Sequence, residues 1–416
     1  MSNSVAKTIW YCHHYAGSPS IGMSYRPYYL TQEFANAGHK AYVVSASFHH
    51  LLRTTEEQNN SVAFRLVDGV PFIYLKVRKY VGNGVKRFAN MLDYAWGFRR
   101  YLKEIVAITG KPDIIIVSTS HPFHFPILFK IAKRFNAKLI FEVRDLWPLS
   151  LLELLKIPSW HPIIRWLARI ERQAYRKSDY VVSLLSDAFP YMGTKGLQEK
   201  NFRVIPNGTS MELFRYPAAL NTHTLNRVKS LQTQDTFLLA YAGAIGEPNA
   251  LKYLIKAMAF IAKRELPIQC IILGDGNLKA ELEKLIEQMQ LNNVHFLASI
   301  PKYEIPAFLT EMHALYLGWN DTKLYQYGVS PNKVFDYMMA GKPIIESGGA
   351  RTSLIEEAGC GIRCRPADPE DIANAIIQVY KMSVGTRKAM GELGVKVVEE
   401  RFNYSTLAAQ YMKLFA

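Results

Sequence analysis

The fold of this chain is constrained most by a regular alternation of short apolar segments and amphipathic segments, which starts again after residue 206. Before that point, helical patterns at 88–107, 123–135 and 162–176 lie among strand-like segments at 9–12, 42–46, 72–77, 114–118, 139–143 and 180–184. After it, strand-like segments recur at 237–241, 268–273, 294–296, 314–317 and 343–345. Alternation of this kind predicts parallel, doubly wound sheets. We therefore expect an α/β protein with two Rossmann-like domains that face a central cleft.

The length of the chain agrees with two domains, because 416 residues exceed what one domain usually holds. We place an N-terminal domain at 1–205 and a C-terminal domain at 206–384. The segment from about 385 to 416 has a helical pattern and no further strand. We expect it to pack back across the first domain.

The charge is distributed unevenly between the two halves. Residues 1–205 hold 28 Lys or Arg and 14 Asp or Glu, whereas the remainder holds 22 and 21. Nearly all of the net charge of +15 therefore lies in the first half. This asymmetry predicts an anionic partner for the first domain and a different partner for the second.

Several classes of protein are disfavoured by what the sequence lacks. It has no apolar run long enough to span a membrane and no evident secretory signal, so we expect a cytoplasmic protein. Cys360 and Cys364 form a close pair, but no second pair or histidine stands at metal-ligand spacing. We expect neither a disulfide framework nor a bound metal.

The strongest local motif covers residues 327–343, with the sequence YGVSPNKVFDYMMAGKP. Ser330 suits a helix N-cap and Pro331 the first helical position. Free N–H groups at that helix start, together with Lys333 in the first turn, would bind an anion such as a diphosphate. Asp336 lies one turn further on, where its carboxylate could accept hydrogen bonds from a sugar diol. An ordinary capped helix with solvated Lys and Asp side chains explains the same pattern when it is taken alone.

This segment resembles the donor-site signature of retaining glycosyltransferases of family 4, which have the GT-B architecture. Further similar blocks occur in the family's order along the chain, at 141–148 (FEVRDLWP), 205–208 (IPNG), 241–243 (YAG) and 273–276 (LGDG). The SPNK and VRDLWP sequences are similar to those of bacterial WbuB-like amino-sugar transferases, which assemble O-antigen and capsule.

The resemblance implies a metal-independent transferase that needs no cofactor and takes a nucleotide sugar, expected to be a UDP-sugar, as donor. It implies catalytic roles for Arg144 and Asp145. Acceptor contacts are expected from Arg26 and His121, with a polyprenyl-diphosphate-linked glycan as acceptor. The implied donor-binding residues are Gly17, Gly246, Gly274, Gly328, Val329, Ser330, Asn332, Lys333 and Asp336.

Two departures from the family pattern concern the donor site. Gly328 stands where a carboxylate usually contacts the sugar, and Asp336 replaces the usual, longer Glu. Ala244 and Asn249 stand in the loop 243–250 where many members carry Arg and Lys. Lys333 and the helix N-terminus must then supply most of the positive charge for the diphosphate.

Basic residues alternate with aromatic ones at 76–80, 86–88 and 96–103. Such segments can rest on an anionic membrane surface, so we expect peripheral association with the inner face of the plasma membrane. A solvated basic helix face is the plainer explanation, and no recognised nucleic-acid-binding module accompanies the charge.

The sequence is also compatible with two other functions. One is a nucleotide-sugar epimerase of similar fold, which needs no acceptor. The other is a membrane- or nucleic-acid-binding protein with a degenerate donor site. A nicotinamide oxidoreductase is less favoured, because no G-x-G-x-x-G motif follows the first strand.

Overall fold

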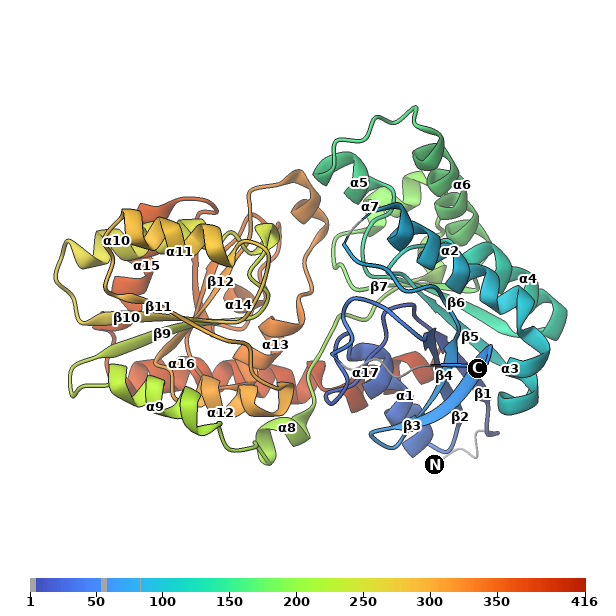
Figure 1. Ribbon diagram of the computed structural model, residues 1–416, viewed down its shortest axis with the longest axis horizontal. Helices are drawn as coiled ribbons and strands as arrows, with labels where there is room; N and C mark the ends of the chain where they lie inside the picture. The colour runs from blue at the N-terminus through green and yellow to red at the C-terminus, as the bar shows by residue number, and fades with distance from the viewer. Residues whose placement is uncertain (1–4, 54–57, 83) are drawn as a thin grey trace. The chain divides into compact units, whose positions relative to one another are not determined.

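The computed structural model describes residues 5–53, 58–82 and 84–416. The chain divides into two compact units. Unit 1 contains residues up to Pro206 together with Tyr404–Ala416, and unit 2 contains Asn207–Asn403. Each unit holds one sheet covered by helices (Figure 1).

Unit 1 is built on an eight-stranded sheet with the order β3-β4-β2-β1-β5-β6-β7-β8. All neighbouring strands are parallel except β3 and β4, which form an antiparallel pair at one edge. The strands are β1 (Thr8–Cys12), β2 (Lys40–Ala46), β3 (Val62–Val67), β4 (Val70–Leu75), β5 (Ile114–Ser118), β6 (Lys138–Val143), β7 (Tyr180–Ser183) and β8 (Phe202–Val204).

The helices of unit 1 pack on this sheet because their apolar stripes face it, as in α6, where Ile164, Leu167 and Ile170 are buried. Helix α4 lies between α2 and α6, while α1 packs against α17. The helices are α1 (Arg26–Asn36), α2 (Val85–Arg100), α3 (Leu102–Thr109), α4 (Phe125–Phe135), α5 (Leu149–Leu154), α6 (Pro162–Lys177), α7 (Phe189–Thr194) and α17 (Tyr404–Met412).

Unit 2 has a six-stranded parallel sheet with the order β11-β10-β9-β12-β13-β14. Its strands are β9 (Phe237–Ala242), β10 (Ile268–Leu273), β11 (Val294–Leu297), β12 (Ala314–Gly318), β13 (Ile344–Ser347) and β14 (Gly361–Cys364). Its helices are α8 (Met211–Arg215), α9 (Thr222–Leu231), α10 (Leu251–Ala262), α11 (Lys279–Gln288), α12 (Ile305–Thr310), α13 (Asn332–Met339), α14 (Leu354–Glu357), α15 (Pro369–Lys381) and α16 (Val384–Val397).

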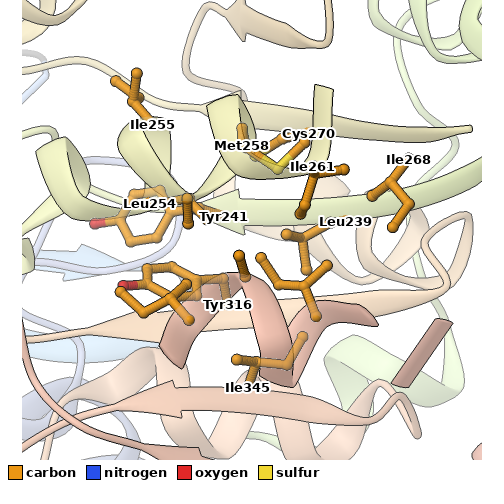
Figure 2. Packing of buried hydrophobic residues seen from close by; sticks show 14 of the residues in the cluster. Leu239, Tyr241, Leu254, Ile255, Met258, Ile261, Ile268, Cys270, Tyr316 and Ile345 are labelled. Atoms are coloured by element: carbon orange, nitrogen blue, oxygen red, sulfur yellow. The ribbon is translucent and has the colours of Figure 1, made fainter. Parts of the chain in front are cut away.

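One face of the unit 2 sheet forms an apolar core with α10 and α15. Figure 2 shows Leu254 and Met258 of α10 packed against Leu239 and Tyr241 of β9. The hydroxyl groups of Tyr241 and Tyr316 extend to the same side of this cluster (Figure 2). The core thus fixes β9 and β12, and ligands of doubly wound sheets bind at the carboxyl ends of such adjacent strands.

The fold class predicted from the sequence is confirmed, since both sheets are doubly wound with helices on their faces. Three details differ from the predictions. The antiparallel pair of β3 and β4 contains a strand that the sequence analysis did not identify. The helix expected at 88–107 is two helices that meet at Tyr101. The helical segment expected at 385–416 divides at Asn403, so that α16 belongs to unit 2, where it packs on α13, and only residues 404–416 belong to unit 1.

The thiol groups lie inside the fold. Cys12, Cys270, Cys360 and Cys364 are all free and buried. Among the described residues, no helix combines the length and the apolar character that crossing a bilayer requires.

Candidate functional site

The candidate donor site lies in unit 2, where β9 ends and the loop 243–250 begins. Lys333, in the first turn of α13, reaches this loop. Its ammonium group donates hydrogen bonds to the hydroxyl of Tyr241, at 2.7 Å, and to Oδ1 of Asn249, at 2.5 Å. The ammonium nitrogen also lies 4.3 Å from the centre of the Tyr241 ring. The structure therefore brings together one residue of the predicted site and two that come from β9 and its loop.

Gly243 makes this approach possible. A Cβ atom on Gly243 would lie 3.2 Å from the Lys333 nitrogen, and its φ of +156° disfavours other residues. Asn249 and Tyr241 both donate to the carbonyl of Ala244, which fixes the loop beneath the ammonium group. Asn249, which replaces a cation of the family pattern, thus acts as an acceptor for Lys333.

Burial lowers the pKa of Lys333 to about 7, because its partners are neutral and do not compensate for lost hydration. Among the described residues, the hydrogen-bond partners of the Lys333 amine are thus neutral, and none is a carboxylate. An anion placed beside it would be attracted strongly and would raise its pKa. This arrangement suits a phosphate group rather than a neutral ligand.

The start of α13 differs from the sequence prediction. The helix begins at Asn332 with Pro331 as its N-cap, so Ser330 does not cap it. Instead, the Ser330 hydroxyl accepts a hydrogen bond from the backbone N–H of Asn207, at 2.9 Å, and the Asn207 amide donates to the Ser330 carbonyl. Ser330 therefore ties the segment before α13 to the first residue of unit 2.

Asp336 does not share the environment of Lys333. Its carboxylate is buried and accepts hydrogen bonds from the Thr209 hydroxyl, at 2.8 Å, and from the ammonium group of Lys302. The side chains of Lys333 and Asp336 therefore have separate partners. In this structure the Asp336 carboxylate, which was expected to contact a sugar diol, forms an ion pair with Lys302.

The other residues of the motif have backbone or packing roles. Gly328 has a φ of +96°, which explains why glycine stands where the family usually has an acidic residue. Val329 packs against an apolar cluster of unit 2. The side-chain oxygen of Asn332 is buried and has no hydrogen-bond partner among the described residues, so it could accept a hydrogen bond from a ligand.

The glycines at 246 and 274 lie in two loops that pack against each other. A Cβ atom on Gly274 would collide with the carbonyl of Gly243 at 1.9 Å. Gly246 begins the turn Glu247–Asn249, and its Cβ position is 3.6 Å from Oδ1 of Asn277. Gly274 is therefore required where its loop meets Gly243, whereas a side chain at residue 246 would make only ordinary contacts.

In unit 1, the carboxyl ends of β1, β2 and β5 carry a cluster of buried histidines. This histidine cluster consists of His13, His14, His49, His121 and His124, each at most 2% exposed. Burial is the main cause that lowers the pKa of every member, to about 3 for His49 and His124. The cluster is therefore neutral at pH 7.

His121, which was expected to contact the acceptor, lies inside unit 1. The residue is completely buried, and its Nε2 lies 2.9 Å from Nδ1 of His14. A side chain enclosed in this way cannot touch a ligand without rearrangement. His121 serves the packing of unit 1.

Arg144 and Asp145 follow β6, as the sequence predicts. The Arg144 guanidinium donates to the Ser24 hydroxyl at 2.9 Å, while its Nη1 is buried without a partner among the described residues. Asp145 is exposed. Arg144 therefore has unused hydrogen-bonding capacity of the kind that a phosphate would satisfy.

Gly17 lies in the loop after β1, and another part of the same loop leaves no room for a side chain at this position. A Cβ atom on Gly17 would meet the carbonyl of Gly22 at 1.9 Å. The backbone N–H of Gly17 donates to the carbonyl of Ser24, at 3.0 Å. The close approach at this position is thus between two parts of one loop.

Arg26, the other residue expected to bind the acceptor, also lies inside unit 1. Its side chain is completely buried and forms an ion pair with Glu142, with Nε and Oε2 2.8 Å apart. It also donates to the carbonyls of Ile205 and Pro206. In this structure the buried Arg26 therefore ties β6 to residues 205 and 206.

Glu142 is the centre of this buried network. It also accepts hydrogen bonds from the hydroxyls of Tyr11, Ser118 and Tyr411. Burial would raise the pKa of Glu142, but the guanidinium groups of Arg26 and Arg144 hold that pKa below its usual value. The carboxylate is therefore ionised, and sequence reasoning missed it because its partner Arg26 is 116 residues away.

The basic segments noted in the sequence are only partly available to a partner. Arg78 forms an exposed ion pair with Asp93, and Tyr80 is buried with its hydroxyl bonded to His50. In α2, by contrast, Trp96 is exposed with the guanidinium of Arg99 over its ring. Lys76, Arg78 and Lys79 are exposed as well, so both segments present cations, but only α2 places an exposed aromatic ring beside them.

Comparisons with known proteins agree with this architecture. The family model for a glycosyl transferase 4-like domain matches residues 22–208, and that for glycosyl transferases group 1 matches residues 223–397. The two matches fall on unit 1 and unit 2 in turn. The fold and these matches define the chain as a glycosyltransferase with the GT-B fold.

The chain is 26% identical over 285 residues to the putative colanic acid biosynthesis glycosyl transferase WcaI of Escherichia coli K12, covering 67% of this chain and 69% of that protein. Sucrose-phosphate synthase from Thermosynechococcus elongatus has a similar structure, with a TM-score of 0.73, 17% identity and coverage of 98% of both chains. HepE from Anabaena, solved with UDP and glucose, has a TM-score of 0.67, 15% identity and the same coverage. These structural similarities establish the fold.

Proposed function

We propose that this glycosyltransferase transfers a sugar from a UDP-sugar to a lipid-linked glycan during synthesis of a bacterial surface polysaccharide. The observation that supports the donor best is the ammonium group of Lys333, held over the loop after β9 by two neutral partners. The UDP bound to HepE and the colanic acid role named for WcaI support the choice of donor and pathway class.

In the proposed reaction, Lys333 contacts the diphosphate of the donor and stabilises the charge that develops on it as the glycosidic bond breaks. The loop 243–250 supplies backbone N–H groups beside the same phosphates. Arg144 offers its unpaired Nη1 to a second anionic group. We infer retention of the anomeric configuration from the resemblance to retaining glycosyltransferases of family 4. We infer no requirement for a metal, because the ammonium group of Lys333 can take the electrostatic role of an ion at the diphosphate.

The donor site is tested by measuring UDP binding with calorimetry for the wild type, Lys333→Met and the control Lys263→Met. Lys263 is an exposed lysine of unit 2 at the end of α10. Loss of a charge-assisted hydrogen bond costs about 1.5 to 3 kcal/mol, so Lys333→Met should bind UDP roughly 10- to 100-fold more weakly. Equal affinities of the two variants would refute the assignment.

The type of reaction is tested with a UDP-sugar and an extracted lipid-linked glycan. Proton NMR of the product should show the anomeric configuration of the donor, and addition of EDTA should leave the rate unchanged. Inversion would contradict the retaining mechanism, and loss of rate in EDTA would contradict metal independence. Formation of an epimerised nucleotide sugar without acceptor would identify an epimerase instead.

A further inference from the structure

The segment that joins α5 to α6 carries a group of exposed apolar side chains, and Figure 1 shows it at the edge of unit 1. Leu154, Leu155 and Trp160 are 55%, 64% and 73% exposed. Ile163 and Trp166, at the start of α6, are 37% and 41% exposed. Large apolar side chains gathered on one exposed segment indicate a contact surface.

Helix α6 adds a row of positive charge beside this segment. Arg165, Arg169, Arg172 and Arg176 are exposed and recur at spacings of four, three and four residues, which places them on one helical face. The acidic residue of α6, Glu171, is buried, and burial raises its pKa to about 7. Hence no acidic side chain of α6 offsets the row of arginines at its exposed surface.

We propose that residues 154–176 form a membrane-docking surface for anionic lipid. Leu154, Leu155 and Trp160 enter the headgroup region of the bilayer, and the arginines of α6 contact lipid phosphates. Tryptophan and arginine beside aliphatic residues are the combination that interfacial helices use. The inference rests on the proposed function in one respect, because a lipid-linked acceptor requires the enzyme to work at a bilayer.

The composition of the surface favours a bilayer over other partners. Leu154 and Leu155 offer neither a stacking surface nor a hydrogen bond to a nucleic acid. Tryptophan and arginine are also frequent at protein interfaces, and self-association of the wild type through this segment is the outcome that would identify such an interface. A bilayer, in contrast, takes up exposed aliphatic side chains and cations at once.

The test uses the full-length protein and flotation with vesicles of equal parts phosphatidylglycerol and phosphatidylethanolamine, with pure phosphatidylcholine vesicles as the neutral comparison. The double variant Leu155→Ser with Trp160→Ser removes apolar contact from exposed positions. The double variant Arg169→Glu with Arg172→Glu reverses charge. The control, Val384→Ser with Leu393→Ser, changes two exposed apolar residues of α16, which are 74% and 47% exposed.

We expect wild type and control to bind anionic vesicles with equal affinity and to bind neutral vesicles weakly. Each test variant should lose about tenfold or more in affinity. The fluorescence of the wild type should shift to the blue on anionic vesicles, and that shift should shrink when Trp160 is replaced.

Unchanged binding of Leu155→Ser with Trp160→Ser would overturn the proposal, as would a wild type that self-associates through this segment and ignores vesicles. The proposal would also be overturned if only Arg169→Glu with Arg172→Glu lost binding, because that result would indicate electrostatic attraction without insertion of apolar side chains. UDP affinity, measured on the same samples, is a separate readout. A wild type that binds vesicles but not UDP would contradict the proposed function and leave the docking surface standing.

Discussion

Replacement of His124 by phenylalanine should make the protein less sensitive to acid. The ring of His124 lies among aromatic rings, 5.4 Å from that of Tyr94 and 6.3 Å from that of Phe98, measured between ring centres. Phenylalanine has nearly the same shape and cannot take up a proton. The substitution therefore keeps the packing and removes one buried titratable group from the histidine cluster.

The size of the effect follows from the pKa of His124 in the two states. Burial lowers the pKa of the folded state to about 3, whereas an unfolded histidine has a pKa of about 6.5. The unfolded chain therefore binds the extra proton first, and stability is lost as the pH falls below about 6.5. A pH of about 5 lies roughly 1.5 units below the pKa of the unfolded histidine, and this difference corresponds to a loss of about 2 kcal/mol in the free energy of unfolding. The variant avoids this loss.

Urea unfolding at pH 7.5 and pH 5, followed by tryptophan fluorescence, measures this difference. Five of the six tryptophans belong to unit 1, so the signal reports mainly on the unit that holds His124. The free energy of unfolding should fall about 2 kcal/mol less in His124→Phe than in the wild type. The reasoning is refuted if both proteins lose the same stability between these pH values.

Two further predictions concern charged groups. The affinity for UDP should fall as the pH rises above about 7, because Lys333 of the free protein then loses its proton and UDP binding must restore it. Calorimetry at about pH 8 in buffers of different ionisation enthalpy should show proton uptake on UDP binding, and Lys333→Met should abolish that uptake. Absence of proton uptake in the wild type would contradict the proposed donor site. Glu142→Gln should destabilise unit 1 by about 3 to 5 kcal/mol at pH 7.5 in the same urea assay, because it leaves the buried charge of Arg26 uncompensated. The half-buried Glu153→Gln serves as control, and equal stabilities would show that the buried pair contributes nothing.

The fold could be predicted because its central strands are continuous apolar runs. Residues 114–118 of β5 are all buried, and buried parallel strands read in this way. Strand β3 could not be recognised by the same signal, because it is an edge strand in which Phe64 and Leu66 remain exposed. The break at Tyr101 between α2 and α3 likewise has no Gly or Pro to mark it at that residue.

The sequence predicts the features of the candidate site that depend on neighbouring residues in the chain, but not its contacts between distant residues. The position of Lys333 in the first turn of a helix follows from the residues around it. Its contact with Tyr241, 92 residues earlier in the chain, depends on how the sheet brings the two together. The ion pair of Arg26 could not be predicted either, because local sequence gives no sign of its buried partner Glu142.

The tail at 404–416 has a consequence for the synthesis of the protein. Tyr404, Leu407 and Tyr411 are buried in unit 1, and the Tyr411 hydroxyl bonds to Glu142. A ribosome makes most of unit 1 first, then all of unit 2, and only then this tail. The face of α1 that meets α17 therefore stays uncovered throughout the synthesis of unit 2. The unit that begins to fold first is thus completed last, and residues 1–206 expressed alone should be prone to aggregation unless the tail is supplied.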